Sequence, residues 1–262
     1  MTVKLDFVNI RSNCKKDIVV IDFLDITDKI SDFDGVIVVG DIHGNWPEFE
    51  IVLERAKNEN LFLVSLGDVM DYGFDNIKCF NELNHLIRTG RAKMLIGNHE
   101  FKLFKYINQS RESNVRIRRQ GGILTTIENM DKLTPSELTQ FEDDYLETYD
   151  NSSFVMKCGD YYFAHGALDP RFWDQHKFAK ATRSMAMFGQ VDNKATPRED
   201  GYPVRRYDWV NSIPAGKTVI VGHDIRSKSA PLTQQGNLGG TAIFLDTGSS
   251  KGGQLSSIKL TF

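Results

Sequence analysis

The chain has 262 residues, a length that fits one large domain or two small ones. Apolar residues make up 40% and charged residues 26%, which is ordinary for a globular protein with a sizeable core. The formal net charge of −3 excludes a globally basic nucleic-acid binder, so any anionic substrate must be attracted by local positive charge or by metal ions.

Neither a disulfide framework nor a membrane segment is expected. The three cysteines, Cys14, Cys79 and Cys158, are odd in number and stand in no paired spacing, which favours a reducing compartment. No apolar stretch approaches the roughly 18 residues needed to cross a bilayer. The first ten residues lack the apolar centre of a signal peptide. These features predict a cytoplasmic protein without a membrane partner.

From residue 36 onward, apolar runs alternate with helix-like stretches. The runs at 36–39, 61–66 and 94–96 precede glycine within a few residues and predict buried strands. Helical spacing of apolar residues predicts the three helices between and after them, at 46–58, 75–89 and 100–107. Such alternation is typical of an α/β layer.

The second half of the chain predicts a different arrangement. Residues 108–150 read as a helical insertion. After residue 152, short strand-like runs separated by Gly and Asp predict a second, largely antiparallel sheet packed on the first, formed by residues 154–166, 218–224, 241–248 and 254–262. We therefore expect a single α/β (α+β) domain over residues 1–262.

Five of the predicted strands end in polar segments that carry Asp, Asn or His. Asp41 and His43 flank Ile42 and can turn toward one ion, and Asp68 can bridge two ions. A mixed set of nitrogen and oxygen donors without thiolate suits Mn²⁺, Fe, Zn²⁺ or Ni²⁺ better than Ca²⁺. The expected ligands of two divalent ions are Asp41, His43, Asp68, Asn98, His165 and His223.

These segments predict a two-metal hydrolase. Two ions about 3.5–4 Å apart can clamp a phosphoryl group and lower the pKa of a bridging water. His99 adjoins Asn98 and is expected to protonate the leaving oxygen, while Asp71 accepts its other N–H and fixes its tautomer.

Three motifs carry a resemblance to a known family: Asp41-x-His43, Gly67-Asp68-x-x-Asp71-x-Gly73 and Gly97-Asn98-His99-Glu100. They are similar to the motifs of the phosphoprotein-phosphatase-type (calcineurin-like) metallophosphoesterases. Longer runs, among them GNHEFKLFKYI and GYPVRRYDW, resemble the phosphatase module of bacterial polynucleotide kinase-phosphatase. The resemblance covers roughly residues 36–259 and implies a two-sheet β-sandwich core flanked by helices, a dinuclear site with Mn²⁺ as the expected metal, and a bacterial or phage-infected bacterial cell.

One position departs from the family pattern. Tyr72 stands where relatives usually carry an arginine that contacts the substrate phosphate. Either other residues bind the phosphate, with Arg205 and Arg206 as candidates, or the preferred substrate carries less terminal charge, as a diester does. Asp246 matches a position near the active site of the polynucleotide branch, although a turn-capping role is equally compatible with the sequence. A basic cluster at Arg116, Arg118 and Arg119 fits a substrate rim or a solvated surface.

The sequence therefore predicts a divalent-metal-dependent phosphoesterase. Its expected substrates are phosphate monoesters, and also diesters, with 2′,3′-cyclic or 3′-end nucleotide phosphates prominent among them. Three alternatives remain: a Ser/Thr protein phosphatase, a dinucleoside polyphosphate hydrolase, and a degenerate metal-binding module that acts by protein contact. The binding partner is accordingly a nucleotide, a nucleic-acid end or a phosphoprotein.

Overall fold

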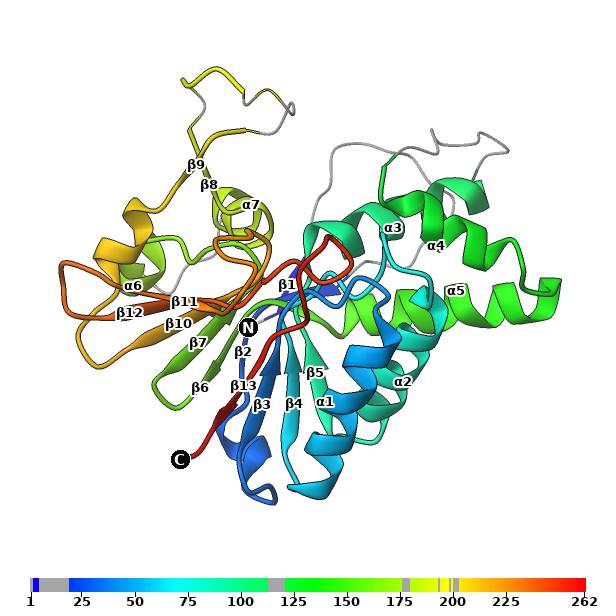
Figure 1. Cartoon of the computed structure of the whole chain (residues 1–262), viewed down its shortest axis with the longest axis horizontal. Coiled ribbons are helices and arrows are strands. Elements are labelled where there is room, and N and C mark those ends of the chain that lie inside the picture. The colour runs from blue at the N-terminus through cyan, green and yellow to red at the C-terminus, as the bar shows by residue number, and fades with distance from the viewer. Residues whose placement is uncertain are drawn as a thin grey trace.

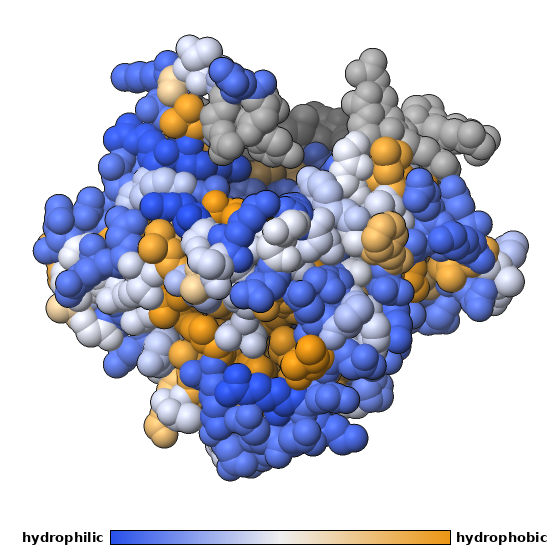
Figure 2. Space-filling view, viewed as in Figure 1, coloured by the Kyte–Doolittle hydropathy of each residue, from blue (hydrophilic) through white to orange (hydrophobic). Residues whose placement is uncertain are grey.

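The computed structural model of the protein describes residues 2–4, 19–112, 121–175, 180–192, 194–197, 199 and 203–262. Within these residues, two β-sheets pack face to face as a β-sandwich, and helices cover its outer faces (Figure 1). This arrangement confirms the predicted α/β class with a two-sheet core flanked by helices. On the face shown in Figure 2, hydrophilic residues cover most of the surface and hydrophobic ones gather mainly in the middle.

The smaller sheet has the strand order β13-β3-β4-β5. Its first three strands in the sequence run parallel, and helices α1 and α2 connect them, as the alternating sequence pattern predicts. Its elements are β3 (Val36–Val39), α1 (Trp46–Asn58), β4 (Phe62–Ser65), α2 (Asn76–Arg88), β5 (Ala92–Met94) and β13 (Ser257–Leu260).

Strand β13 corrects one prediction. The sequence pattern places residues 254–262 in the second sheet, but β13 pairs antiparallel with β3, so that Leu260 lies opposite Val36 and Ser257 opposite Val39. An apolar alternation indicates a strand without indicating its partner, because any buried sheet edge can accept it. The end of the described chain therefore returns to the first sheet.

The larger sheet has the order β1-β2-β6-β7-β10-β12-β11. It was expected to be largely antiparallel, which is wrong, because β2 with β6, β7 with β10, and β10 with β12 are parallel pairs. Long connections between these strands allow parallel pairing, which short-range sequence patterns do not reveal. Its strands are β1 (Thr2–Lys4), β2 (Val19–Asp25), β6 (Ser153–Cys158), β7 (Tyr161–Ala164), β10 (Thr218–Val221), β11 (Leu232–Gln235) and β12 (Thr241–Phe244).

Further helices surround the sandwich, and two of them lie in the described part of the segment expected to be helical. A capping box at Thr134 and Glu137 fixes the start of one of these, α5. The remaining elements are η1 (Thr27–Ile30), α3 (Asn98–Glu112), α4 (Ile123–Met130), α5 (Pro135–Asp150), α6 (Arg171–Gln175), α7 (Lys180–Phe188), β8 (Gln190–Val191), β9 (Arg205–Arg206) and η2 (Asp208–Ser212). None of the helices in the described ranges has the length and apolarity needed to cross a bilayer.

The core explains why the strand ends meet. Strand β3 is buried on both faces, since Val36 and Val38 pack between the sheets while Ile37 and Val39 pack toward the helices. Opposite them, Phe163 of β7 and Ile220 of β10 complete the layer between the sheets. This packing brings the loops that follow β3, β4, β5, β7, β10 and β12 to one edge of the sandwich, as the contacts within the site show.

Candidate active site

The six side chains expected to bind metal lie together at this edge. The carboxylate of Asp68, after β4, is the centre of the group. Its Oδ2 lies 3.3 Å from Nε2 of His165 and 3.9 Å from Nε2 of His43. His165 Nε2 is also 3.1 Å from Oδ1 of Asn98, the first residue of α3. The backbone N–H of His223 donates to Oδ1 of Asp41 at 3.0 Å, which ties the loop after β10 to the loop after β3.

The backbone at the site adopts an uncommon conformation. His43, Asp68, Asp71, Tyr72 and His223 have φ angles of 48°, 51°, 76°, 68° and 67°, in the left-handed region that non-glycine residues rarely occupy. Such conformations cost about 1–3 kcal/mol each and persist only where surrounding structure enforces them. Five in one site indicate that the fold holds these side chains in place at the expense of stability.

Glu100 is one of the groups that enforce this conformation, and the sequence analysis gave it no role. Its buried carboxylate accepts N–H bonds from Asp68 at 2.7 Å, Val69 at 2.9 Å and Gly97 at 3.0 Å. Burial raises the pKa of Glu100 to about 7, and the charge of Asp68 acts in the same direction. Its place in the motif Gly97-Asn98-His99-Glu100 was its sequence signal, but that signal did not indicate the bonds to Asp68 and Val69, which lie 32 and 31 residues away.

Two glycines let the backbone approach the carboxylates. A Cβ atom on Gly97 would lie 2.3 Å from Oδ1 of Asp68, and one on Gly222 would lie 2.3 Å from Oδ1 of Asp41. Neither distance is compatible with a side chain. Both glycines are therefore required by the close packing of the two aspartates.

The imidazoles are oriented with one nitrogen toward the site. Nδ1 of His43 lies 2.9 Å from the carbonyl oxygen of Met70, and Nδ1 of His165 lies 2.8 Å from that of Leu66. Donation of Nδ1–H to these carbonyls leaves Nε2 of both rings as the nitrogen that would ligate a metal. Burial lowers the pKa of His43 to about 3, which keeps this ring neutral.

Two buried carboxylate oxygens favour a bound cation. Oδ2 of Asp41 and Oδ2 of Asp246 have no hydrogen-bond partner among the described residues. Burial, followed by the charge of Asp246, raises the pKa of Asp41 well above its usual range. Burial likewise raises the pKa of Asp246, although the N–H of Gly248 bonds its Oδ1 at 2.9 Å. Unpaired buried carboxylates are costly, and divalent ions would remove that cost.

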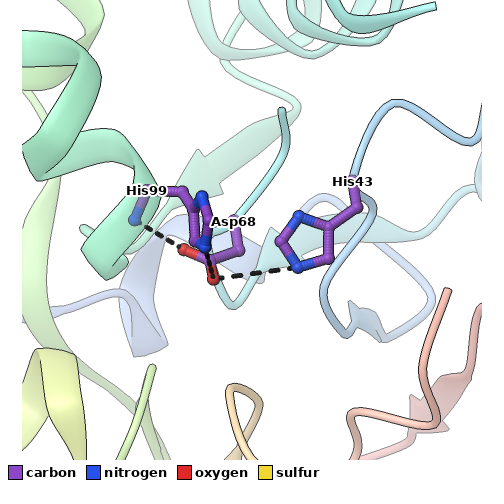
Figure 3. Close-up of side chains that lie close together, drawn as sticks. All are labelled: His43, Asp68 and His99. Atoms are coloured by element: carbon purple, nitrogen blue, oxygen red, sulfur yellow. Dashed lines mark hydrogen bonds and ion pairs between the residues drawn. The ribbon is translucent and has the colours of Figure 1, made fainter. Parts of the chain in front are cut away.

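Two groups of donors have ligand atoms within 4.8 Å of one another: His43, Asp68 and His99, and Asp68, His165 and His223. Asp68 is shared by both groups, in keeping with a ligand that touches two ions. Figure 3 shows the first group, with His43, from the loop after β3, and His99, from the first turn of α3, directed toward Asp68. The residues present therefore fit divalent metal ions, with oxygen and imidazole donors and no thiolate.

His99 has a second carboxylate partner. Its Nδ1 lies 2.6 Å from Oδ2 of Asp71, and Thr126 of α4 donates to Oδ1 of the same carboxylate. Burial alone would lower the pKa of His99, but the charge of Asp68 and the hydrogen bond to Asp71 outweigh it and raise this pKa. The Nε2 atom of this ring lies 3.8 Å from Asp68 Oδ2. Thr126 was not anticipated from the sequence.

A cavity of about 470 Å³ opens over the site, and Asp68, Asn98 and His99 contribute to its lining. Arg205 also lines it, with Nη2 2.8 Å from Nε2 of His223. Arg206 lies elsewhere, paired with Asp208 on the surface. The cluster of Arg116, Arg118 and Arg119 and the histidine at position 176 lie outside the described residues.

Three other lining residues bear on substrate binding. Tyr72 faces the cavity, and its ring centre lies 5.0 Å from that of His43 and 5.4 Å from that of His99. Lys228 and Lys251 also line the cavity, and sequence reasoning missed both of them. Lysine is common on surfaces, so neither position carried a sequence signal beyond the glycines that follow Lys251.

Comparison with known proteins identifies one matching family and several proteins of similar sequence. The sequence profile of the family described as calcineurin-like phosphoesterase matches residues 35–243. A bis(5′-nucleosyl)-tetraphosphatase PrpE (asymmetrical) from Anoxybacillus flavithermus is 23% identical over 234 residues, which cover 85% of this chain and 89% of the relative. A relative of the same name from Geobacillus sp. WCH70 is 25% identical over the same shares.

Two solved structures resemble the fold. A crystal structure provisionally assigned as a diadenosine tetraphosphatase has a TM-score of 0.58 and 23% identity, and covers 92% of this chain and 98% of its own. A serine/threonine phosphatase from Saccharomyces cerevisiae has a TM-score of 0.51 and 15% identity, with 86% of this chain and 71% of the yeast chain covered. Both likenesses concern the fold.

Proposed function

Because the chain belongs to the calcineurin-like phosphoesterase family, a family of metal-dependent hydrolases of phosphate esters, we propose that it hydrolyses phosphate esters of nucleotides at a site for two divalent ions. The observation that carries this proposal is the clustering of the six expected metal ligands, with Asp68 at their centre, beneath a cavity that is also lined by His99, which is paired with Asp71. Manganese is the metal that we expect to support activity best.

The proposed roles of the chain's own residues follow from their positions. The residues that would hold the ions are Asp41 and His43 on one side, Asn98, His165 and His223 on the other, and Asp68 between them. When bound, such ions supply Lewis-acid polarisation of the phosphoryl group and a nucleophilic water. His99 would donate the proton on Nε2 to the leaving oxygen, while Asp71 keeps Nδ1–H oriented.

Nucleotide phosphate esters are the first substrate class that we propose, with 3′-end phosphates as the monoesters and 2′,3′-cyclic phosphates as the diesters. The resemblance of GYPVRRYDW and related runs to the polynucleotide branch supports this choice. Hydrolysis of dinucleoside polyphosphates is the second candidate. Two observations favour it: the names of the curated relatives, and the three cationic side chains around the cavity, Arg205, Lys228 and Lys251.

A substrate panel tests these proposals. The Mn²⁺-loaded protein is assayed with 2′,3′-cyclic nucleotides, 3′-phosphorylated oligonucleotides, dinucleoside polyphosphates and phosphopeptides, and kcat/KM is compared. We expect a nucleotide substrate to rank first, and Asp68→Asn to serve as the inactive control because it weakens the shared ligand. Preference for phosphopeptides would favour a protein phosphatase instead. Absence of turnover with every substrate and with Mn²⁺, Fe²⁺, Zn²⁺ and Ni²⁺ would contradict the proposed function.

A further inference from the structure

Lys251 brings an ammonium group into the active site from the loop after β12. Its Nζ lies 2.7 Å from Nε2 of His43 and 4.5 Å from the centre of the Tyr72 ring. It lines the same cavity as Asn98 and His99. The ammonium is therefore beside the atoms that would contact a phosphoryl group.

The loop that carries Lys251 is fixed at several points. Ser249 donates its hydroxyl to the carbonyl of Ile42 at 2.9 Å and accepts a bond from Asn45 at 3.1 Å, so the loop is joined to the one that bears Asp41 and His43. At its base, Thr247 Oγ1 donates to the carbonyl of Gln254 at 2.6 Å. The loop is therefore held in a fixed position within the site.

The backbone of Lys251 itself is also held. Nζ of Lys228 donates to the Lys251 carbonyl at 2.7 Å, and the N–H of Lys251 donates to the carbonyl of Gly248 at 2.9 Å. These bonds hold the backbone of Lys251 at the cavity wall. Its ammonium can therefore move only by rotation about the side-chain bonds.

No direct ion pair joins the Lys251 ammonium to a carboxylate among the described residues, although its charge reaches Asp41 and Asp246 and opposes the rise in their pKa values. The contacts of its ammonium are with a neutral imidazole nitrogen and the face of an aromatic ring. A cation over an aromatic ring is attracted by the negative face of the ring but keeps its charge. An anion that enters the cavity would thus meet an available positive charge.

We propose that Lys251 binds the substrate phosphate and that the ring of Tyr72 supports it from below. This inference rests on the proposed function. A cation on Nε2 of His43 would displace the ammonium from that nitrogen into the cavity, where the oxygens of a phosphoryl group would lie. The pair then supplies the positive charge that Tyr72, on its own, does not provide.

Binding of inorganic phosphate tests the proposal without turnover. Calorimetry is performed on the Mn²⁺-loaded protein and on Lys251→Met, which keeps an unbranched side chain, shorter by one atom, and removes the charge. We expect the Kd for phosphate to rise about 10- to 100-fold, the range of a charge-assisted hydrogen bond. Lys251→Arg should retain most of the affinity. The matched control is Lys217→Met, whose lysine pairs with Asp160 outside the site and whose loss should leave Kd unchanged.

Kinetics and metal binding complete the test. For a monoester dianion, kcat/KM of Lys251→Met should fall by a similar factor, and introducing Tyr72→Arg into that variant should restore part of it. Titration with Mn²⁺ should show that both ions still bind. An unchanged phosphate Kd in Lys251→Met, or a loss explained by weaker Mn²⁺ binding, would overturn the proposal. If the wild type is active and Lys251→Met has the same activity and phosphate Kd, the role of Lys251 is wrong and the proposed function stands. If the wild type is inactive, the proposed function is wrong, and the phosphate Kd values still test Lys251.

Discussion

At the scale of single residues, the site separates two kinds of side chain: those that face Asp68 and those that hold them in place. His99 belongs to the first kind, and its contact with Asp71 belongs to the second. The buried carboxylate of Glu100 also positions others, since it binds three backbone N–H groups of the loops that carry Asp68 and Asn98. This division determines what each substitution should change.

Substitution of His99 tests its role as proton donor. His99→Ala should lower kcat by about 10²- to 10⁴-fold for esters with poorly acidic leaving groups, the usual contribution of general acid catalysis. The loss should be much smaller for a nitrophenyl ester, because nitrophenolate leaves without a proton. The ratio of the two losses is the measurement. Equal losses for both substrates would contradict the role.

Substitution of Asp71 tests the pKa of His99. The hydrogen bond from Nδ1 to Asp71 helps to raise this pKa, and a raised pKa keeps the acid form present to higher pH. Activity that needs the protonated ring should therefore decline on the alkaline side. Asp71→Asn removes the carboxylate charge, so the decline should begin at lower pH. The measurement is the profile of kcat against pH for the wild type, Asp71→Asn and His99→Ala. An alkaline limb that does not move in Asp71→Asn would contradict the effect of Asp71 on the pKa of His99.

At the scale of secondary structure, local patterns indicated many of the elements but not their partners, and helices α6 and α7 and strand β11 were not predicted. The spacing of apolar residues predicted a helix at 46–58, and α1 has these bounds. The same kind of pattern indicated a strand near residue 258 but put it in the wrong sheet, since pairing with β3 joins residues over 200 positions apart. The side chains at strand ends could be predicted from the sequence, because Gly-Asp and Gly-His are local patterns of neighbouring residues.

The site residues that were not predicted from the sequence are placed there by contacts with residues far away along the chain. Thr126 reaches Asp71 from 55 residues away, and Lys251 reaches His43 from 208 residues away. Thr, Lys and Glu are common on surfaces, so no local pattern marks such positions. Only the packing of α4 and of the loop after β12 against the first sheet brings them to the site.

The capping box of α5 gives an element-scale prediction. Thr134 Oγ1 accepts the N–H of Glu137 at 3.3 Å, and Glu137 accepts the N–H of Thr134 at 2.8 Å. Thr134→Ala should destabilise the protein by about 1 kcal/mol. For a chain of this size that corresponds to a fall in Tm of about 2–4 °C. Thr139→Ala, within the exposed part of the same helix, is the control and should change Tm little. A similar Tm for both variants would show that the cap contributes nothing.

At the scale of the whole molecule, the site joins the two sheets. Asp41, Asp68 and Asn98 follow strands of the smaller sheet, whereas His165 and His223 follow strands of the larger one. Without metal, burial opposes protonation of His165, but the charge of Asp68 raises its pKa to about 10. Bound ions would replace that proton and connect the sheets directly.

Removal of metal should therefore affect stability as well as activity. Exhaustive chelation should abolish turnover and lower Tm, and Mn²⁺ should restore both. A ligand at 100 times its Kd stabilises the folded state by about 2.7 kcal/mol per site. Thermal unfolding is followed with and without Mn²⁺, and Asp68→Asn should reduce the Mn²⁺-dependent shift. Full activity in protein shown by elemental analysis to lack metal would exclude a metal-dependent mechanism.

The pairing of β13 with β3 also bears on colloidal behaviour. Strand β3 consists of four buried apolar residues, Val-Ile-Val-Val, and β13 satisfies its outer row of backbone N–H and C=O groups. A chain shortened to end at residue 253 would present this strand as a bare edge, and apolar, uncharged edges template the addition of strands from other molecules. We expect such a variant to self-associate at concentrations where the full chain stays monodisperse, which static light scattering would measure. The pairing of β13 with β3 would thus protect the protein from aggregation.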